Sequence, residues 1–271
     1  MPIVTAPTVT KLGPEARGAV LVTGSHGGVY PGGLAAKAQV RAVIFHDAGL
    51  GRGDAGIGAL TLLAKLGIAA AAVSHMSARV GDTDDMLARG IISRFNAVAG
   101  EAGITRAMPC AVAAEMLQAA PWRIAQAPPV PDEARTVLQP EGARRNLVLI
   151  DSAALVDAAA DRGAVIVTGS HGGLVGGVPA MALRADGYAA AFNDAGIGID
   201  QAGIGRLAAL DARGIAAITV GAQSARIGDA RSTLDDGLIS AMNATASAWG
   251  ARTGTRAAEV LLAWTRRGDQ S

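Results

Sequence analysis

Two histidines occupy the same glycine-rich motif at separate places in the chain. Residues 24–28 and 169–173 both read GSHGG. An imidazole exchanges a proton near neutral pH, so His26 and His171 are predicted to be catalytic. The flanking glycines leave backbone N–H groups accessible to an anion. We therefore predict substrate contacts from the rest of each motif: Ser25, Gly27 and Gly28, and then Ser170, Gly172 and Gly173. The structural alternative is a tight turn whose histidine bonds a neighbouring carbonyl.

A carboxylate motif follows each histidine motif. Residues 47–49 and 194–196 both read DAG. Asp47 and Asp194 are predicted to orient the imidazole, as the aspartate of a catalytic triad does. The alternatives are a metal ligand, a carboxylate base, or a structural residue that caps a helix or folds a turn.

A third motif combines a hydroxyl with a guanidinium, because residues 77–79 and 224–226 both read SAR. Ser77 and Ser224 are the predicted nucleophiles, since the serine next to each motif histidine points away from it in extended chain. Arg79 and Arg226 are predicted to hold a substrate carboxylate with two hydrogen bonds. The structural alternative is an ion pair with the aspartate three residues later, which is Asp82 or Asp229.

The three motifs recur because the chain contains an internal repeat. Residues 18–28 and 163–173 agree at ten of eleven positions, and residues 41–100 match residues 188–247 at 29 of 60 positions without a gap. We predict a tandem duplication of a unit of about 125 residues. The first copy is residues 1–125, a proline-rich connector covers residues 126–145, and the second copy is residues 146–271.

Each motif follows a short apolar segment typical of a buried strand. In the first copy these segments are residues 19–23, 42–45 and 68–73, and residues 3–5 and 147–150 are predicted to open the two copies. Helices are predicted at residues 55–66, 84–99, 111–120 and 257–266, and Asn96 falls within the second of them. This alternation indicates an α/β fold with a mostly parallel sheet and pseudo-twofold symmetry. All three motifs then lie at the carboxyl edge of the sheet, where ligands bind in open α/β folds.

Two histidines of the first copy are not retained in the second. His46 and His75 are replaced there by Asn193 and Ala222. A lone histidine is more often structural than catalytic, so His75 is given little weight. Two arrangements fit the sequence: one site in each copy, or a composite site that contains both motif histidines.

The composition argues against several classes of function. The chain has 24 Lys and Arg against 23 Asp and Glu, and its 3 Phe, 3 Trp and 2 Tyr are few, so we expect no nucleic-acid partner. A single cysteine, Cys110, excludes an internal disulfide and a multi-cysteine metal site. Neither a membrane span nor a secretory signal is recognised. We expect a cytoplasmic protein without a membrane partner, and a homodimer as the default assembly.

The motifs together predict a hydrolase that acts on a small, carboxylate-bearing amide, ester or cyclic amide without a cofactor. The histidine transfers the proton, and the aspartate orients the imidazole ring. The serine attacks the substrate or positions water, and the glycine-turn amides stabilise the oxyanion. One alternative is a divalent-metal enzyme with His26, Asp47 and Asp82 as ligands. Another is a two-lobed protein that binds a small anion without catalysis.

Two of these segments resemble blocks of the caspase-like peptidases. A strand followed by Ser-His-Gly resembles their histidine block, and residues 222–226, AQSAR, resemble their cysteine block. Ser224 stands at the position of the thiol, and an additional predicted strand separates the blocks. A peptidase function is therefore not carried over to this chain.

Overall fold

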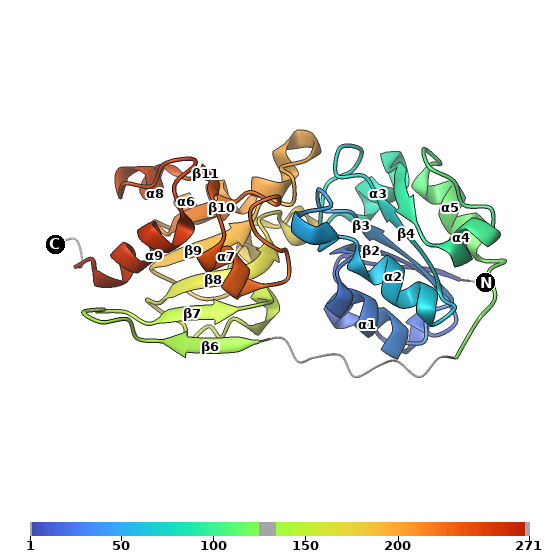
Figure 1. The fold of residues 1–271 in the computed structure, drawn as a ribbon, viewed down its shortest axis with the longest axis horizontal. Helices are drawn as coiled ribbons and strands as arrows, with labels where there is room; N and C mark the ends of the chain where they lie inside the picture. The colour runs from blue at the N-terminus through green and yellow to red at the C-terminus, as the bar shows by residue number, and fades with distance from the viewer. Residues whose placement is uncertain (1, 125–133, 269–271) are drawn as a thin grey trace. The chain divides into compact units, whose positions relative to one another are not determined.

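The computed structural model describes residues 2–124 and 134–268, and it is an α/β protein with two mixed, mostly parallel sheets (Figure 1). The chain divides into two compact units, each of which contains one sheet. The first unit is Met1–Asp132 with the short segments Val175–Gly177 and Ile197–Ala202. The second unit is Glu133–Leu174, Val178–Gly196 and Gly203–Ser271. Residues 126–133 of the predicted connector lie outside the described residues.

The sheet of the first unit has five strands in the order of the sequence. They are β1 (Ile3–Ala6), β2 (Val20–His26), β3 (Ala42–His46), β4 (Ala69–Val73) and β5 (Ile92–Phe95). β1 to β4 are parallel and β5 is antiparallel to β4. The central strands are buried and consist largely of Val, Ile and Ala, which is typical of strands covered on both faces. The strands predicted in this copy are confirmed.

Helices cover both faces of this sheet. α1 (Val29–Lys37) and α2 (Gly58–Lys65) pack over the face that contains Leu21, Val43 and Phe45. α3 (Thr83–Arg89), α4 (Ala97–Glu101) and α5 (Cys110–Leu117) cover the opposite face, which contains Val22 and Ile44. The parallel strands therefore end at one edge of a three-layered unit, and this edge carries the DAG and SAR motifs.

The single helix predicted over residues 84–99 is wrong. α3 ends before Gly90, the chain then forms β5, and a separate short helix α4 follows. A Cβ at Gly90 would lie 2.3 Å from the carbonyl oxygen of Met86, so this close turn requires glycine. The apolar spacing of the segment fits a helix, but pairing of β5 with β4 determines its conformation.

Asn96 is a structural residue at the start of α4, not a residue inside a long helix. Its Oδ1 accepts the N–H groups of Ala70 at 3.1 Å and Ala99 at 2.9 Å, and its Nδ2 donates to the carbonyls of Leu60 at 3.3 Å and Ile68 at 2.8 Å. Asn243 makes the same four bonds in the second unit at the same distances, to Ala217, Ala246, Leu207 and Ile215.

The sheet of the second unit has six strands in the order β11-β10-β9-β8-β7-β6. They are β6 (Arg135–Leu138), β7 (Leu147–Ile150), β8 (Val165–His171), β9 (Ala189–Asn193), β10 (Ala216–Val220) and β11 (Ile239–Met242). β7 to β10 are parallel, and the two edge strands are antiparallel to their neighbours. β6 lies within the segment predicted as a connector, so that segment contributes a strand to this sheet.

The helices of the second unit are α6 (Arg206–Asp211), α7 (Ala230–Asp235), α8 (Ala244–Ala248) and α9 (Ala257–Arg266). α9 has the predicted bounds. Between β8 and β9 the chain forms short 3-10 turns where the first unit has α1. No helix in the described parts of the chain is both long and apolar enough to cross a membrane.

Arg206 forms hydrogen bonds that stabilise the irregular segment between β8 and β9. Its Nε donates to the carbonyl of Gly173 at 3.0 Å, and its Nη1 donates to the carbonyls of Met181 and Ala182. The guanidinium is buried over the ring of Phe192, and burial lowers the pKa of Arg206 to about 10. One side chain therefore satisfies three backbone carbonyls of this segment.

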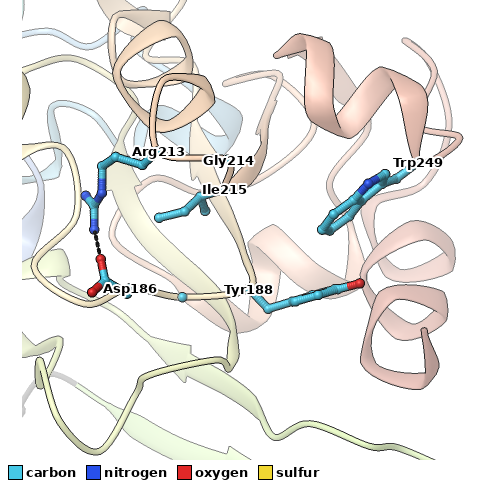
Figure 2. Close-up of a pocket in the computed structure, with 7 residues that line it drawn as sticks. Asp186, Tyr188, Arg213, Gly214, Ile215 and Trp249 are labelled. Atoms are coloured by element: carbon cyan, nitrogen blue, oxygen red, sulfur yellow. Dashed lines mark hydrogen bonds and ion pairs between the residues drawn. The ribbon is translucent and has the colours of Figure 1, made fainter. Parts of the chain in front are cut away.

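Aromatic residues gather at the amino end of the second sheet (Figure 2). The rings of Tyr188 and Trp249 stack with centroids 4.6 Å apart, and Trp264 meets Trp249 edge to face at 5.9 Å. The guanidinium of Arg145 lies 3.6 Å from the centroid of Tyr188, and that of Arg267 lies 5.0 Å from the centroid of Trp249. These contacts hold the rings in a fixed arrangement.

Candidate active site

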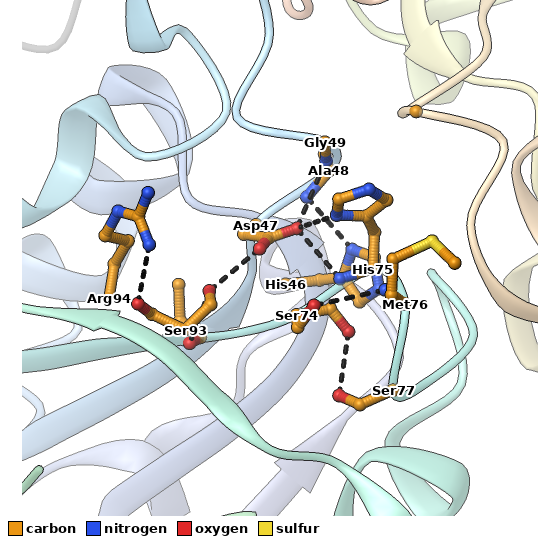
Figure 3. A network of polar contacts seen from close by, with 12 residues as sticks. His46, Asp47, Ala48, Gly49, Ser74, His75, Met76, Ser77, Ser93 and Arg94 are labelled. Atoms are coloured by element: carbon orange, nitrogen blue, oxygen red, sulfur yellow. Dashed lines mark hydrogen bonds and ion pairs between the residues drawn. The ribbon is translucent and has the colours of Figure 1, made fainter. Parts of the chain in front are cut away.

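A cluster of polar side chains lies at the carboxyl ends of β3 and β4 in the first unit (Figure 3). Asp47 directly follows β3, and His75 follows β4 by one residue. Ser93 comes from β5, at an irregularity in its pairing with β4. The cluster therefore lies at the edge of the sheet that the motif positions predict.

Asp47 is a buried carboxylate with four hydrogen-bond donors around it. Its Oδ1 accepts the backbone N–H of Gly49 at 3.1 Å, and from His75 it accepts both the backbone N–H and the ring Nδ1, each at 2.9 Å. Its Oδ2 accepts the hydroxyl of Ser93 at 2.8 Å. Burial raises the pKa of Asp47, but the hydrogen bonds from His75 and Ser93 outweigh it, so the pKa is lowered and the group is ionised.

His75 is oriented by this carboxylate. Because Asp47 is an acceptor, Nδ1 of His75 carries the proton and Nε2 has the free lone pair in the neutral ring. The side chain of His75 is 23% exposed, against 3% for Asp47. Nε2 makes no hydrogen bond to any residue in the described ranges. The carboxylate therefore fixes the tautomer of a partly exposed imidazole.

The loop after β3 turns back on itself, so that its backbone N–H groups reach Asp47. Ala48, Gly49 and Leu50 all have positive φ, at 47°, 73° and 63°. A non-glycine residue in this left-handed region costs about 1 kcal/mol, and such strain gathers at functional sites. The conformation lets the N–H of Gly49 reach the Asp47 carboxylate and the N–H of Leu50 reach the Asp47 carbonyl.

His46 is a structural residue of this cluster. Its Nδ1 accepts the N–H of Ala48 at 3.1 Å, and its Nε2 donates to the carbonyl of Ala78 at 2.9 Å, which joins the loops after β3 and β4. Burial lowers the pKa of His46, so the ring is neutral. In the second unit Asn193 makes the equivalent bonds, with the N–H of Ala195 and the carbonyl of Ala225.

The structure places His75, and not His26, against Asp47. His26 ends β2 and pairs with His46 in the sheet register, and its Nδ1 accepts the N–H of Gly28 at 3.1 Å. Burial, and secondarily the neighbouring His46, lower the pKa of His26 to about 4. A ring with this pKa and an occupied Nδ1 is a weak base at neutral pH, so a role in the turn fits His26 better than general-base catalysis. Its partner in the turn is the N–H of Gly28 and not the carbonyl that the turn interpretation expects.

The backbone amides expected to bind an oxyanion are already used within the chain. The N–H of Gly27 donates to the carbonyl of His46 at 3.0 Å, that of Gly28 donates to His26, and that of Gly172 donates to the carbonyl of Asn193 at 2.7 Å. The carbonyls of Gly172 and Gly173 accept the backbone N–H and the Nε of Arg206. The expected anion nest at the GSHGG motifs therefore does not fit the observed contacts.

The motif serines bond to backbone groups. Ser77 donates to the carbonyl of Ser74 at 2.9 Å and accepts the N–H of Ile91 at 2.9 Å. Ser224 makes the corresponding bonds to Gly221 and Leu238. Within the residues that the structure describes, no hydrogen bond joins Ser77 to His26. This arrangement favours a loop-bracing role for Ser77 over the predicted nucleophilic role.

The serines next to the motif histidines brace the segments that follow the first strands. Ser25 accepts the backbone N–H of Val9 at 3.0 Å, and Ser170 accepts that of Ala153 at 2.8 Å. These hydroxyls hold the chain that enters the sheet, which supplies a structural reason for their retention in both copies.

Arg79 forms the local ion pairs that the structural alternative predicts. Its guanidinium lies 3.2 Å from Asp82 and 3.1 Å from Asp85, and we therefore do not assign it to a substrate carboxylate. Asp82 also accepts the N–H of Asp85 as the cap of α3. Arg226 is exposed, and among the described residues its side chain makes no ion pair.

The second unit keeps the carboxylate but not the imidazole of this cluster. Oδ1 of Asp194 accepts the N–H groups of Gly196 and Ala222, each at 2.8 Å. Ala222 stands where the first unit has His75, and His171 is buried at the end of β8. The carboxylate therefore shapes the loop even where no histidine accompanies it.

The metal alternative gains no support from the geometry. Residues 2–124 and 134–268 contain no group of three or more His, Cys, Asp and Glu side chains arranged to hold a metal ion. His26, Asp47 and Asp82 have the separate partners described above.

His75 is the functional candidate that sequence comparison missed. Selecting positions retained in both copies excludes it, because its counterpart is Ala222. The available signal was its position: His75 lies two residues beyond the end of β4, Asp47 lies directly after β3, and parallel neighbours end side by side. No protein-family model, curated protein or solved structure matches this chain.

Proposed function

We propose that the chain is a hydrolase whose first unit cleaves a small amide or ester with His75 as general base. The hydrogen bond from His75 to the buried Asp47 is the observation that carries this proposal. General-base catalysis of this kind contributes about 10²- to 10⁴-fold in rate. The active nucleophile is water, because the Ser77 hydroxyl is committed to backbone partners.

The reaction proceeds by proton transfer through Nε2 of His75. Nε2 takes a proton from water while the water oxygen forms a bond to the substrate carbonyl carbon. The same proton then passes to the leaving nitrogen or oxygen as its bond to carbon breaks. Asp47 keeps Nδ1 protonated and stabilises the imidazolium that exists between the two transfers.

We propose in addition that the two units arose by tandem duplication and that the catalytic imidazole belongs to the first. The equal bond sets of Asn96 and Asn243 support a common origin. The replacement of His75 by Ala222 supports a division of roles. A carboxylate-bearing substrate, a homodimer and a cytoplasmic location stay predictions from the sequence.

Chromogenic esters and anilides test the proposed activity directly. Turnover of a p-nitrophenyl ester or a p-nitroanilide of a short acid is measured with the full chain and with His75→Ala. Alanine is the residue that the second unit has at this position, so the fold is expected to survive. We expect at least a 100-fold loss in kcat/KM. Binding of the whole substrate panel without any product would contradict a hydrolase and support the anion-binding alternative.

A further inference from the structure

A cavity of about 300 Å³ opens at the amino end of the second sheet (Figure 2). It is lined by Asp186, Tyr188, Arg213, Gly214, Ile215 and Trp249. Tyr188 directly precedes β9 and Ile215 directly precedes β10. Asp194 follows the other end of β9, so this cavity is separate from the second unit's DAG motif.

One side of the cavity carries two opposite charges held next to each other. Nη2 of Arg213 lies 3.0 Å from Oδ1 of Asp186. Arg213 also donates to the carbonyls of Leu183 at 2.7 Å and Ala185 at 2.8 Å, which fixes its guanidinium. The side chains are 28% and 71% exposed, so both charges are accessible from the opening.

The other side of the cavity is apolar and rigid. It consists of Ile215, the indole of Trp249 and the ring of Tyr188, which stands between Arg145 and Trp249. In Figure 2 the Tyr188 and Trp249 rings lie on the side opposite the Asp186–Arg213 pair, with Ile215 between them. Rings fixed in this way offer an apolar contact surface without a further loss of conformational entropy on binding.

We propose that this cavity binds a free α-amino acid with an apolar or aromatic side chain. The ammonium group pairs with Asp186, the carboxylate pairs with Arg213, and the side chain packs on Ile215 and Trp249. A simple anion would be repelled by Asp186 and a simple cation by Arg213, whereas a zwitterion matches both charges. The volume is at the lower end of the range for small-molecule sites, about 300–1,000 Å³, which suits a ligand of this size.

The corresponding positions of the first unit lack these features. At a constant offset of 147 residues, Asp186, Tyr188, Arg213 and Trp249 correspond to Gln39, Arg41, Leu66 and Ala102. Both charges and both rings are therefore particular to the second unit. The apolar floor is shared, because Ile215 corresponds to Ile68.

Calorimetric titration of the full chain tests this site independently of any hydrolase activity. L-phenylalanine and L-leucine are the test ligands. Phenylacetate lacks the ammonium group, phenethylamine lacks the carboxylate, and glucose tests for a sugar site. We expect the two amino acids to bind at least tenfold more tightly than the other three compounds.

Substitution of Asp186 gives the matched variant. Asp186→Gln introduces the residue found in the first unit at an exposed position, so the fold is preserved, and it is expected to weaken L-phenylalanine binding at least tenfold. Arg184→Gln is the control, because Arg184 is exposed and does not line the cavity, and binding should stay unchanged. The proposal is overturned if neither amino acid binds, if phenylacetate, phenethylamine or glucose binds as tightly, or if Asp186→Gln has no effect.

Discussion

Oδ1 of Asp47 accepts two hydrogen bonds from His75, one from the backbone N–H and one from the ring Nδ1, both at 2.9 Å. One oxygen thus fixes both the loop after β4 and the orientation of the imidazole. From residue 222 the equivalent oxygen of Asp194 accepts the backbone N–H alone, because the side chain there is that of alanine. The loop geometry is therefore independent of the imidazole, and a histidine placed there finds its carboxylate already in position.

The His46→Asn variant is predicted to keep both the fold and the proposed activity. Asn193 already makes the two corresponding bonds in the second unit, so the amide replaces the imidazole without an unsatisfied buried group. Thermal unfolding and ester turnover should both stay close to wild type. His46→Leu is the contrasting variant, and the loss of two buried bonds should destabilise it by about 2–4 kcal/mol.

The protein is predicted to lose stability as the pH falls from 6.5 toward 4. The unfolded chain protonates His26 near its ordinary pKa of about 6.5, whereas burial lowers the folded pKa to about 4. The contribution of the neutral His26 ring to the free energy of unfolding is therefore complete above pH 6.5. It decreases below that pH, by about 2 kcal/mol between pH 7 and pH 5. The lowered pKa of His46 acts in the same direction.

Urea unfolding at a series of pH values measures this dependence. His26→Gln should flatten the profile between pH 7 and pH 5. An unchanged slope in that variant would show that His26 is not the group responsible.

Arg206→Met is predicted to destabilise the second unit by about 2–4 kcal/mol. The substitution keeps the volume of the side chain but removes its bonds to the carbonyls of Gly173, Met181 and Ala182. Urea denaturation measures the loss. Ala59→Gly, at the matched position of the first unit, is the comparison, and a loss for Arg206→Met no larger than for this variant would contradict the bracing role.

Much of the fold followed from periodicity, but the division of residues 84–99 into helix, strand and helix did not. The apolar residues of this segment suit a helix, and nothing local to the sequence reveals that β4 has an open edge for residues 92–95. The strands were easier to predict, because β2, β3 and β4 are short, β-branched or alanine-rich runs that end at polar motifs.

The sequence favoured His26 as the imidazole beside Asp47, whereas the structure has His75 against this carboxylate, at the same edge of the sheet. Agreement between the two DAG motifs selected Asp47, and Asp194 has the same loop-shaping role. The same criterion favoured His26 and excluded His75, because the residue that corresponds to His75 in the second unit is Ala222. Which histidine reaches the carboxylate depends on side-chain geometry, and spacing along the chain does not contain that information.

The Ala222→His variant is predicted to create a second histidine–aspartate pair. In the His75→Ala background it should raise ester turnover at least tenfold, because Asp194 already accepts the N–H of residue 222 at 2.8 Å. Ala222→Leu in the same background is the control for a bulkier side chain. Equal turnover of the histidine and leucine variants, both folded by circular dichroism, would contradict the idea that the carboxylate is prearranged.

Ester turnover of His75→Ala and His26→Ala, measured side by side, is the most direct test of the proposed site. A general base at His75 predicts a loss of at least 100-fold in kcat/KM for His75→Ala and a loss of less than fivefold for His26→Ala. The opposite result, full turnover without the His75 imidazole and none without that of His26, would contradict the assignment.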